Sequence, residues 1–79
     1  MSPFARLVEQ ELARARSGHK PLNSLHEAYA VILEELDALW DEARKKREDR
    51  SPSCVLKELV QIGAMAQRTA EDLGLIELF

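Results

Sequence analysis

Apolar residues recur along this chain at spacings of three and four, which is the period of an amphipathic α-helix and not the alternation of a β-strand. Three such stretches predict an all-α fold, with helices over about residues 3–16, 24–48 and 52–73. Each helix carries one apolar stripe: Phe4, Val8, Leu12 and Ala15 in the first, Leu25, Tyr29, Ile32, Leu36, Leu39 and Ala43 in the second, and Val55, Leu59, Ile62, Ala66, Ala70 and Leu73 in the third. These stripes are the predicted core.

Capping residues mark the helix ends. Ser2 is a suitable N-cap, and Pro3 suits the first helical position because its missing N–H would be unpaired there anyway. Ser24 and Glu27 form a capping-box pattern, in which we expect the Glu side chain to return to the N-cap amide. The second helix is expected to continue to about Lys46–Asp49, where basic residues complement the negative end of the helix dipole.

Seventy-nine residues make one domain with a modest core. Cys54 is the only cysteine, so a disulfide within the chain is excluded. We therefore expect association of subunits, as a homodimer or homotetramer, to supply further stability, and the three-helix protomer to form an oligomeric helical bundle. An apolar tail after Gly74 is expected to pack across a subunit interface; it contains Leu75, Ile76, Leu78 and Phe79.

Charge and hydropathy exclude several classes of function. A net charge of −3 disfavours a nucleic-acid-binding regulator, because the field of the protein repels phosphate backbones. No apolar run reaches the roughly 20 residues of a membrane span, so no membrane partner is expected. Glu9 and Glu11 interrupt any signal-peptide pattern, which favours the cytoplasm.

Acidic residues lie on the shoulders of the second and third predicted helices. At about 100° per residue, Glu35 and Glu42 fall beside the apolar stripe, while Glu34 points nearly opposite the core. Glu58 occupies the equivalent shoulder of the next helix. Two long helices joined by a short turn pack antiparallel, so Glu35 and Glu58 could face one groove. With the predicted helix ends, Glu35 stands further from the turn than Glu58, and a partner subunit would correct the mismatch.

Such a pair of carboxylates has two interpretations. Mg²⁺ prefers hard oxygen ligands, retains several waters, and could be held by two or three carboxylates and a substrate phosphate. Alternatively, Glu35, Glu42 and Glu58 are boundary acids paired with lysine or arginine. Their shared shoulder favours the metal site.

The same residues carry a family resemblance. The stretch 25–73, and above all EELDALWDE followed by KELVQIGAMAQ, resembles the all-α nucleoside triphosphate pyrophosphohydrolases, especially their compact MazG-like members. That family has EExxE on one helix and ExxD on the next. Its members use Mg²⁺ to cleave nucleoside triphosphates between the α and β phosphates, which releases pyrophosphate.

The motif positions match in part. The double acid maps to Glu34 and Glu35, and the first acid of ExxD maps to Glu58. The third acid of EExxE falls at Ala38, which cannot bind a metal, and the closing Asp of ExxD falls at Gln61, whose amide oxygen is a weaker ligand. Two of the five positions therefore depart from the family pattern.

The resemblance implies the following roles. Glu35 and Glu58 would hold Mg²⁺ or Mn²⁺, with Gln61 and Glu42 as further ligands, since Glu42 lies one turn beyond the changed position. Glu34 or Glu42 would orient the attacking water, so that the predicted catalytic residues are Glu34, Glu35 and Glu58. The predicted phosphate-binding residues are Lys45, Lys46, Arg47 and Lys57.

Two functions are compared on this basis. The preferred one is Mg²⁺-dependent pyrophosphohydrolysis of a nucleoside triphosphate, with removal of non-standard nucleotides as a role. The alternative is a catalytically silent, oligomeric helical interaction module of the same fold. The two differ in whether the acids bind metal.

Overall fold

The computed structural model describes residues 1–78, and these residues form helices and no strands. The α-helices are α1 (Pro3–Gly18), α2 (Leu25–Ala43) and α3 (Pro52–Asp72), with short 3₁₀ turns η1 (Arg47–Asp49) and η2 (Ile76–Leu78). The predicted all-α class and its three helices are confirmed. Phe79, predicted to belong to the apolar tail, lies outside the described residues.

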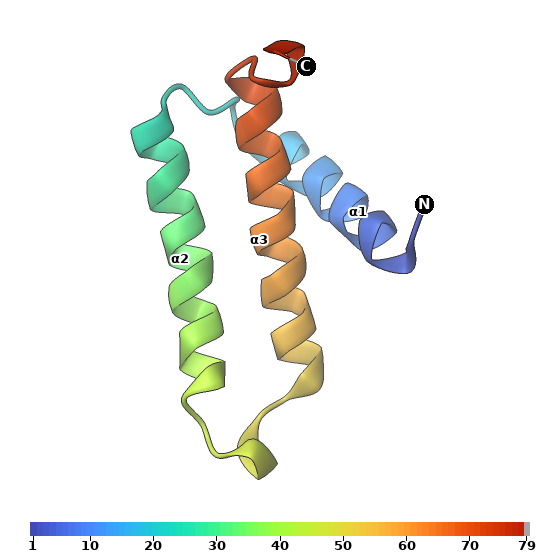
Figure 1. Cartoon of the computed structure of the whole chain (residues 1–79), viewed down its shortest axis with the longest axis vertical. Coiled ribbons are helices and arrows are strands. Elements are labelled where there is room, and N and C mark those ends of the chain that lie inside the picture. The colour runs from blue at the N-terminus through green and yellow to red at the C-terminus, as the bar shows by residue number, and fades with distance from the viewer. Residues whose placement is uncertain (79) are drawn as a thin grey trace.

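Helices α2 and α3 lie side by side and antiparallel, and α1 crosses behind α3 (Figure 1). Both α1 and α2 pack on α3, whereas they barely touch each other. The molecule is therefore a two-helix layer of α2 and α3 with α1 against one flank of α3. None of the helices in residues 1–78 is long and apolar enough to cross a membrane.

The predicted caps are present. The Ser2 side chain accepts a hydrogen bond from the Ala5 amide at 3.1 Å, and Ser24 accepts one from the Glu27 amide at 3.1 Å. The Glu27 carboxylate reaches the amide of Asn23, at 3.4 Å, and not that of the N-cap residue itself. These bonds satisfy N–H groups that the first turn of a helix leaves unpaired.

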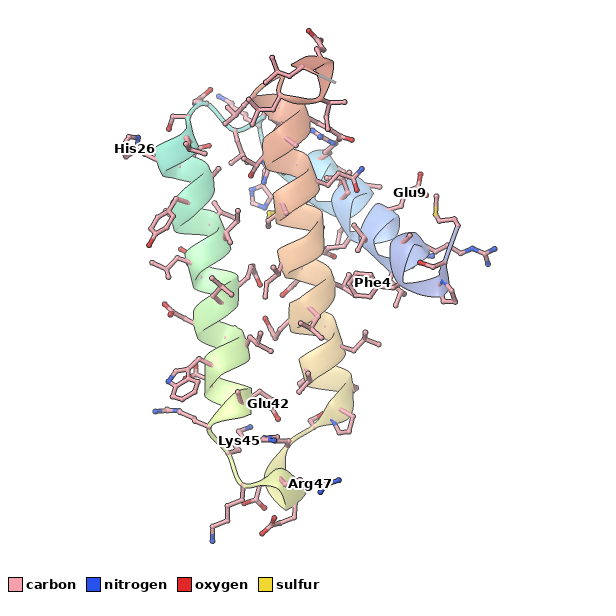
Figure 2. All side chains as sticks on the ribbon, viewed as in Figure 1. Phe4, Glu9, His26, Glu42, Lys45 and Arg47 are labelled. Carbon is pink, nitrogen blue, oxygen red and sulfur yellow. The ribbon has the colours of Figure 1, made fainter. Side chains whose placement is uncertain are left out.

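The predicted end of the second helix is wrong, because α2 stops at Ala43 and not near residue 48. A buried carboxylate, Glu42, accepts a hydrogen bond from the Ser51 amide at 2.6 Å, and Arg50 donates to the Ala43 carbonyl at 2.5 Å. These hydrogen bonds come from residues beyond the turn and hold the chain in a reversal at the end of α2. The backbone of Lys46 is already extended. Figure 2 shows Glu42 between the ends of α2 and α3, beside Lys45.

The core lies mainly between α1 and α3. Its buried cluster joins the predicted stripe of α1 to three residues of α3, and consists of Val8, Leu12, Ala15, Val60, Ala64 and Met65. A methyl group at Gly63 would lie 3.1 Å from Val8 Cγ2, so this glycine allows α1 to approach closely, with Phe4 beside it (Figure 2). Val8, Leu12 and Ala15 of the predicted α1 stripe are confirmed as core, whereas Phe4 is 43% exposed.

Most of the stripe predicted for the second helix is not core in the single chain, although Ile32 is half-buried against the core cluster. Tyr29 is 65% exposed and Trp40 61%, and Leu25 and Leu36 are exposed as well. The helix instead turns its shoulder to α3, with Ala28 fully buried. Much of the predicted core of α2 therefore faces outward.

Candidate functional site

Glu35 of α2 and Glu58 of α3 meet at Gln61. In the amide orientation that satisfies its neighbours, the Gln61 nitrogen donates to Glu35 Oε2 at 2.7 Å and to Glu58 Oε2 at 3.3 Å. The early end of α2 explains this alignment, because Glu35 stands eight residues before Ala43 and Glu58 six residues after Pro52. No partner subunit is needed to bring the two acids to the same height.

The surroundings of the Glu35 carboxylate disfavour its ionised form. Burial raises its pKa above the ordinary value of 4.5, and repulsion from Glu58 raises it further. Glu34 and then Glu11 contribute smaller repulsions in the same direction. A raised pKa means that the ionised carboxylate lacks full compensation from the protein, so an added cation would be stabilised there.

Glu11 of α1 is a third acid at this place, and the sequence interpretation gave it no role here. Its carboxylate forms a two-point ion pair with Arg14, whose Nε lies 2.8 Å from Glu11 Oε2. The hydrogen bond from Arg14 lowers the pKa of Glu11, against burial, and Gln61 and Lys57 favour the charged form as well. Glu11 lies three residues after Val8 and four before Ala15, so helical phase places it beside the α1 stripe, but not next to Glu35 and Glu58.

Two cations border the acids. Arg14 lies close enough to Glu35 for that carboxylate to help raise the pKa of its guanidinium, after the larger effect of Glu11. Lys57 of α3 lies close enough to Glu11 for its charge to help lower the pKa of that carboxyl. The predicted phosphate-binding residue Lys57 is thus beside the site, and Arg14 joins it as a cation that sequence reasoning did not include.

Two surface hollows meet at these residues. One, of about 840 Å³, lies between α1 and α3 and includes Ser53 and Lys57 in its lining. The other, of about 470 Å³, reaches from α1 across to α2 and includes Glu34 and Glu35. Three side chains, Glu11, Arg14 and Gln61, line both hollows. A ligand in either hollow would therefore lie beside Glu11 and Gln61, whereas Glu58 lines neither hollow.

Other predicted site residues lie elsewhere. Glu42 stands seven residues after Glu35, about 10 Å along the helix axis. Its two carboxylate oxygens are used by the Ser51 amide and by Lys45, at 2.6 and 3.0 Å. The basic residues at 45–47 lie at the same connection, with Arg47 on the turn beyond it (Figure 2). The structure does not bring these residues to Glu35 and Glu58.

Gln61 presents its nitrogen, not its oxygen, to the carboxylates, so it acts here as a donor that holds the two acids together. Glu34 is exposed and lines the smaller hollow. Within residues 1–78, no three His, Cys, Asp or Glu side chains are grouped so that they could hold a metal ion among themselves. What the chain offers is a pair of carboxylates.

The chain matches no family model, no curated protein and no solved structure.

The paired carboxylates define the chemistry that this site can support. Two hard oxygen donors with excess negative charge fit a divalent cation such as Mg²⁺, which uses one or two carboxylates, several waters and the phosphates of a substrate. The flanking cations, Arg14 and Lys57, suit anionic oxygens of the same substrate.

Proposed function

We propose that this protein is a Mg²⁺-dependent nucleoside triphosphate pyrophosphohydrolase that converts a nucleoside triphosphate to the monophosphate and pyrophosphate. The observation that carries the proposal is the meeting of Glu35 and Glu58 at Gln61, from antiparallel helices. The resemblance of residues 25–73 to the MazG-like family gives the reaction class. The cytoplasm stays the compartment predicted from the sequence.

In this proposal Glu35 and Glu58 hold the cation, and the Gln61 amide keeps the two carboxylates together. Bound Mg²⁺ or Mn²⁺ would neutralise phosphate oxygens and make a water more acidic. Glu34, adjacent to Glu35 and open to the smaller hollow, accepts the proton as the water oxygen adds to the α-phosphorus. The bond from that phosphorus to the bridging oxygen breaks, and pyrophosphate leaves. Lys57 contacts the phosphates.

Calorimetric titration with Mg²⁺ and Mn²⁺, and pyrophosphate release from a panel of nucleoside triphosphates, test this function. Glu35→Gln and Glu58→Gln keep the shape of each side chain but remove the charge, so both are expected to abolish metal binding and turnover. Glu9→Gln is the matched control, because Glu9 is exposed on α1 away from the other helices (Figure 2). A folded wild-type chain that neither binds metal nor releases pyrophosphate from any nucleotide would refute the proposal.

That negative result would favour the second candidate, a catalytically silent helical interaction module. The observation that supports it is the outward-facing apolar surface of α2, with Tyr29 and Trp40 exposed. As a module, the chain would function through association alone. Both candidates are expected to act as homo-oligomers, as the sequence analysis predicts.

A further inference from the structure

Arg68 of α3 is a buried cation with few hydrogen-bond partners. It is 5% exposed, and its Nη2 donates to the Lys20 carbonyl at 2.6 Å. Its Nη1 lies 3.8 Å from the sulfur of Met65, a weak acceptor, and its Nε has no hydrogen-bond partner within residues 1–78. A guanidinium has several N–H groups, so those of Arg68 are only partly used. Because buried polar groups in proteins are nearly always hydrogen-bonded, this side chain indicates a missing acceptor.

The acid beside Arg68 does not supply that acceptor. Asp72 Oδ2 lies 3.5 Å from Arg68 Nε, which makes an ion pair without a hydrogen bond. The same oxygen accepts from the Leu22 amide at 2.9 Å, and the other oxygen accepts from Arg16 at 2.6 Å. Glu71 pairs with Arg16 as well, at 2.7 Å. Arg16 and Arg68 therefore share one buried carboxylate, and Arg68 keeps donors for a further anion.

Arg68 stands at one end of the smaller hollow. Three residues of α3 line this hollow, Gln61, Met65 and Arg68. Arg68 follows Gln61 by seven residues, about 10 Å along the helix axis. The Arg68 end is therefore separate from the end at which Gln61 meets Glu35. With a volume of about 470 Å³, the hollow has room for a small ligand at the Arg68 end alone.

The connection between α1 and α2 forms part of the wall around Arg68. It passes beside the C-terminal part of α3 (Figure 1), and Lys20 accepts the hydrogen bond from Arg68 there. Three residues of the connection line the hollow and carry nitrogen donors in their side chains: His19, Lys20 and Asn23. Hydrogen-bond donors thus come from two elements at this end.

The acids of the smaller hollow lie mainly toward its other end. Glu35 and Glu11 both interact with Gln61 there, and Glu34 is adjacent to Glu35. Glu27, at the start of α2, also lines the hollow, and its carboxylate accepts from a backbone amide of the connection at 3.4 Å. An anion at the Arg68 guanidinium would therefore be separated from the paired carboxylates by about two helical turns.

We propose that the Arg68 end of the smaller hollow binds a phosphate group, held by the Arg68 guanidinium together with donors of the α1–α2 connection. A guanidinium binds phosphate oxygens through two parallel hydrogen bonds. Phosphate has further oxygens for donors that approach from the connection, whereas a carboxylate has only two. The group can come from free inorganic phosphate or from the end of the phosphate chain of a nucleotide. The site requires neither metal nor turnover, so it does not depend on the function proposed above.

NMR of the arginine side chains in the full chain tests this site in a metal-free buffer. At constant ionic strength, inorganic phosphate is expected to shift the Nε–Hε resonance of Arg68 until the site is saturated. Arg6, exposed on α1 and outside both hollows, supplies the control resonance, which should not move. A nucleoside triphosphate then distinguishes the sources. A saturable shift with the triphosphate identifies the end of a nucleotide as a ligand, and a shift with inorganic phosphate alone identifies a free anion.

Arg68→Lys keeps the charge and removes the planar donor group, so calorimetry is expected to show phosphate binding weakened at least about 10-fold. Arg6→Lys makes the same substitution at an exposed position and should bind phosphate as the wild type does. Two results would overturn the proposal. One is an Arg68 resonance that neither inorganic phosphate nor the triphosphate moves, and this wild-type measurement decides if circular dichroism shows Arg68→Lys to be unfolded. The other is equal phosphate affinity of the two lysine variants when both are folded.

Discussion

Replacing Glu35 by Gln should stabilise the protein, although it removes a residue that the proposed function needs. Glu35 Oε2 and Glu58 Oε2 lie 2.7 and 3.3 Å from one nitrogen of Gln61, so they cannot be more than about 6 Å apart. Two negative charges at about 6 Å repel by about 0.7 kcal/mol in water and about 2.8 kcal/mol at an effective dielectric constant near 20. For this half-buried pair we expect Glu35→Gln to gain about 1 kcal/mol at pH 7.

The pH dependence tests whether the gain comes from removing the ionised Glu35 carboxylate. The pKa of Glu35 is raised in the folded state, so folding favours the protonated acid. Stability therefore falls as the pH rises from the ordinary value of 4.5 through the pKa of the folded protein, and the loss is complete at neutral pH. The gain of Glu35→Gln should consequently be present at pH 7 and shrink below pH 4.5. For a domain of this size, 1 kcal/mol corresponds to roughly 4–8 °C in the unfolding midpoint.

Thermal unfolding followed by far-ultraviolet circular dichroism measures this effect in a metal-free buffer. Glu9→Gln serves as the control for loss of an exposed carboxylate and should leave the midpoint unchanged. Millimolar Mg²⁺ should then stabilise the wild type and leave Glu35→Gln unaffected, because ligand binding to the folded state raises stability. If Glu35→Gln lowers the midpoint at pH 7, or gains equally at both pH values, then burial and repulsion from Glu58 do not destabilise the ionised Glu35 carboxylate.

Two further predictions concern the ends of the helix layer. Asp72→Asn should cost about 2 kcal/mol in urea unfolding, because Asp72 accepts from the Leu22 amide at 2.9 Å and from Arg16 at 2.6 Å. Burial favours the neutral acid, but these donors hold the pKa of Asp72 below its ordinary value of 3.8. The stabilisation from the charged Asp72 is therefore present at neutral pH and is lost as the pH falls below 3.8. Glu42→Gln weakens the bond that anchors the start of α3, so hydrogen exchange at the Ser51 amide should become faster than in the wild type.

Local signals in the sequence predicted much of the fold. The starts of the first two helices follow from serine caps at Ser2 and Ser24, since each cap acts on an amide a few residues away. The apolar stripe of α1 was also predicted, because the helical period alone determines which side of an amphipathic helix faces the core. The end of α2 was not predictable in the same way. It depends on Glu42 reaching Ser51, a contact between residues on opposite sides of a turn.

The same distinction applies to the candidate site. The shoulder positions of Glu35 and Glu58 followed from helical phase. Their equal distance from the α2–α3 turn did not, because it depends on α2 ending at Ala43. Glu42 has the same phase as Glu35, but phase carries no information on height, and two turns separate them. The contribution of α1 was not anticipated, because the direction in which α1 crosses α3 depends on the close approach at Gly63.

The exposed stripe on α2 connects the proposals. In the single chain this stripe has the correct period for a core and is largely exposed to solvent. Since Leu36 and Glu35 are neighbours about 100° apart, covering the apolar side of the layer leaves the hollows on the other side open to a ligand. A partner on this side would therefore contact α2 and α3, the two helices that hold the paired carboxylates, without blocking them. Glu58→Gln should abolish Mg²⁺ binding whether or not this side is covered.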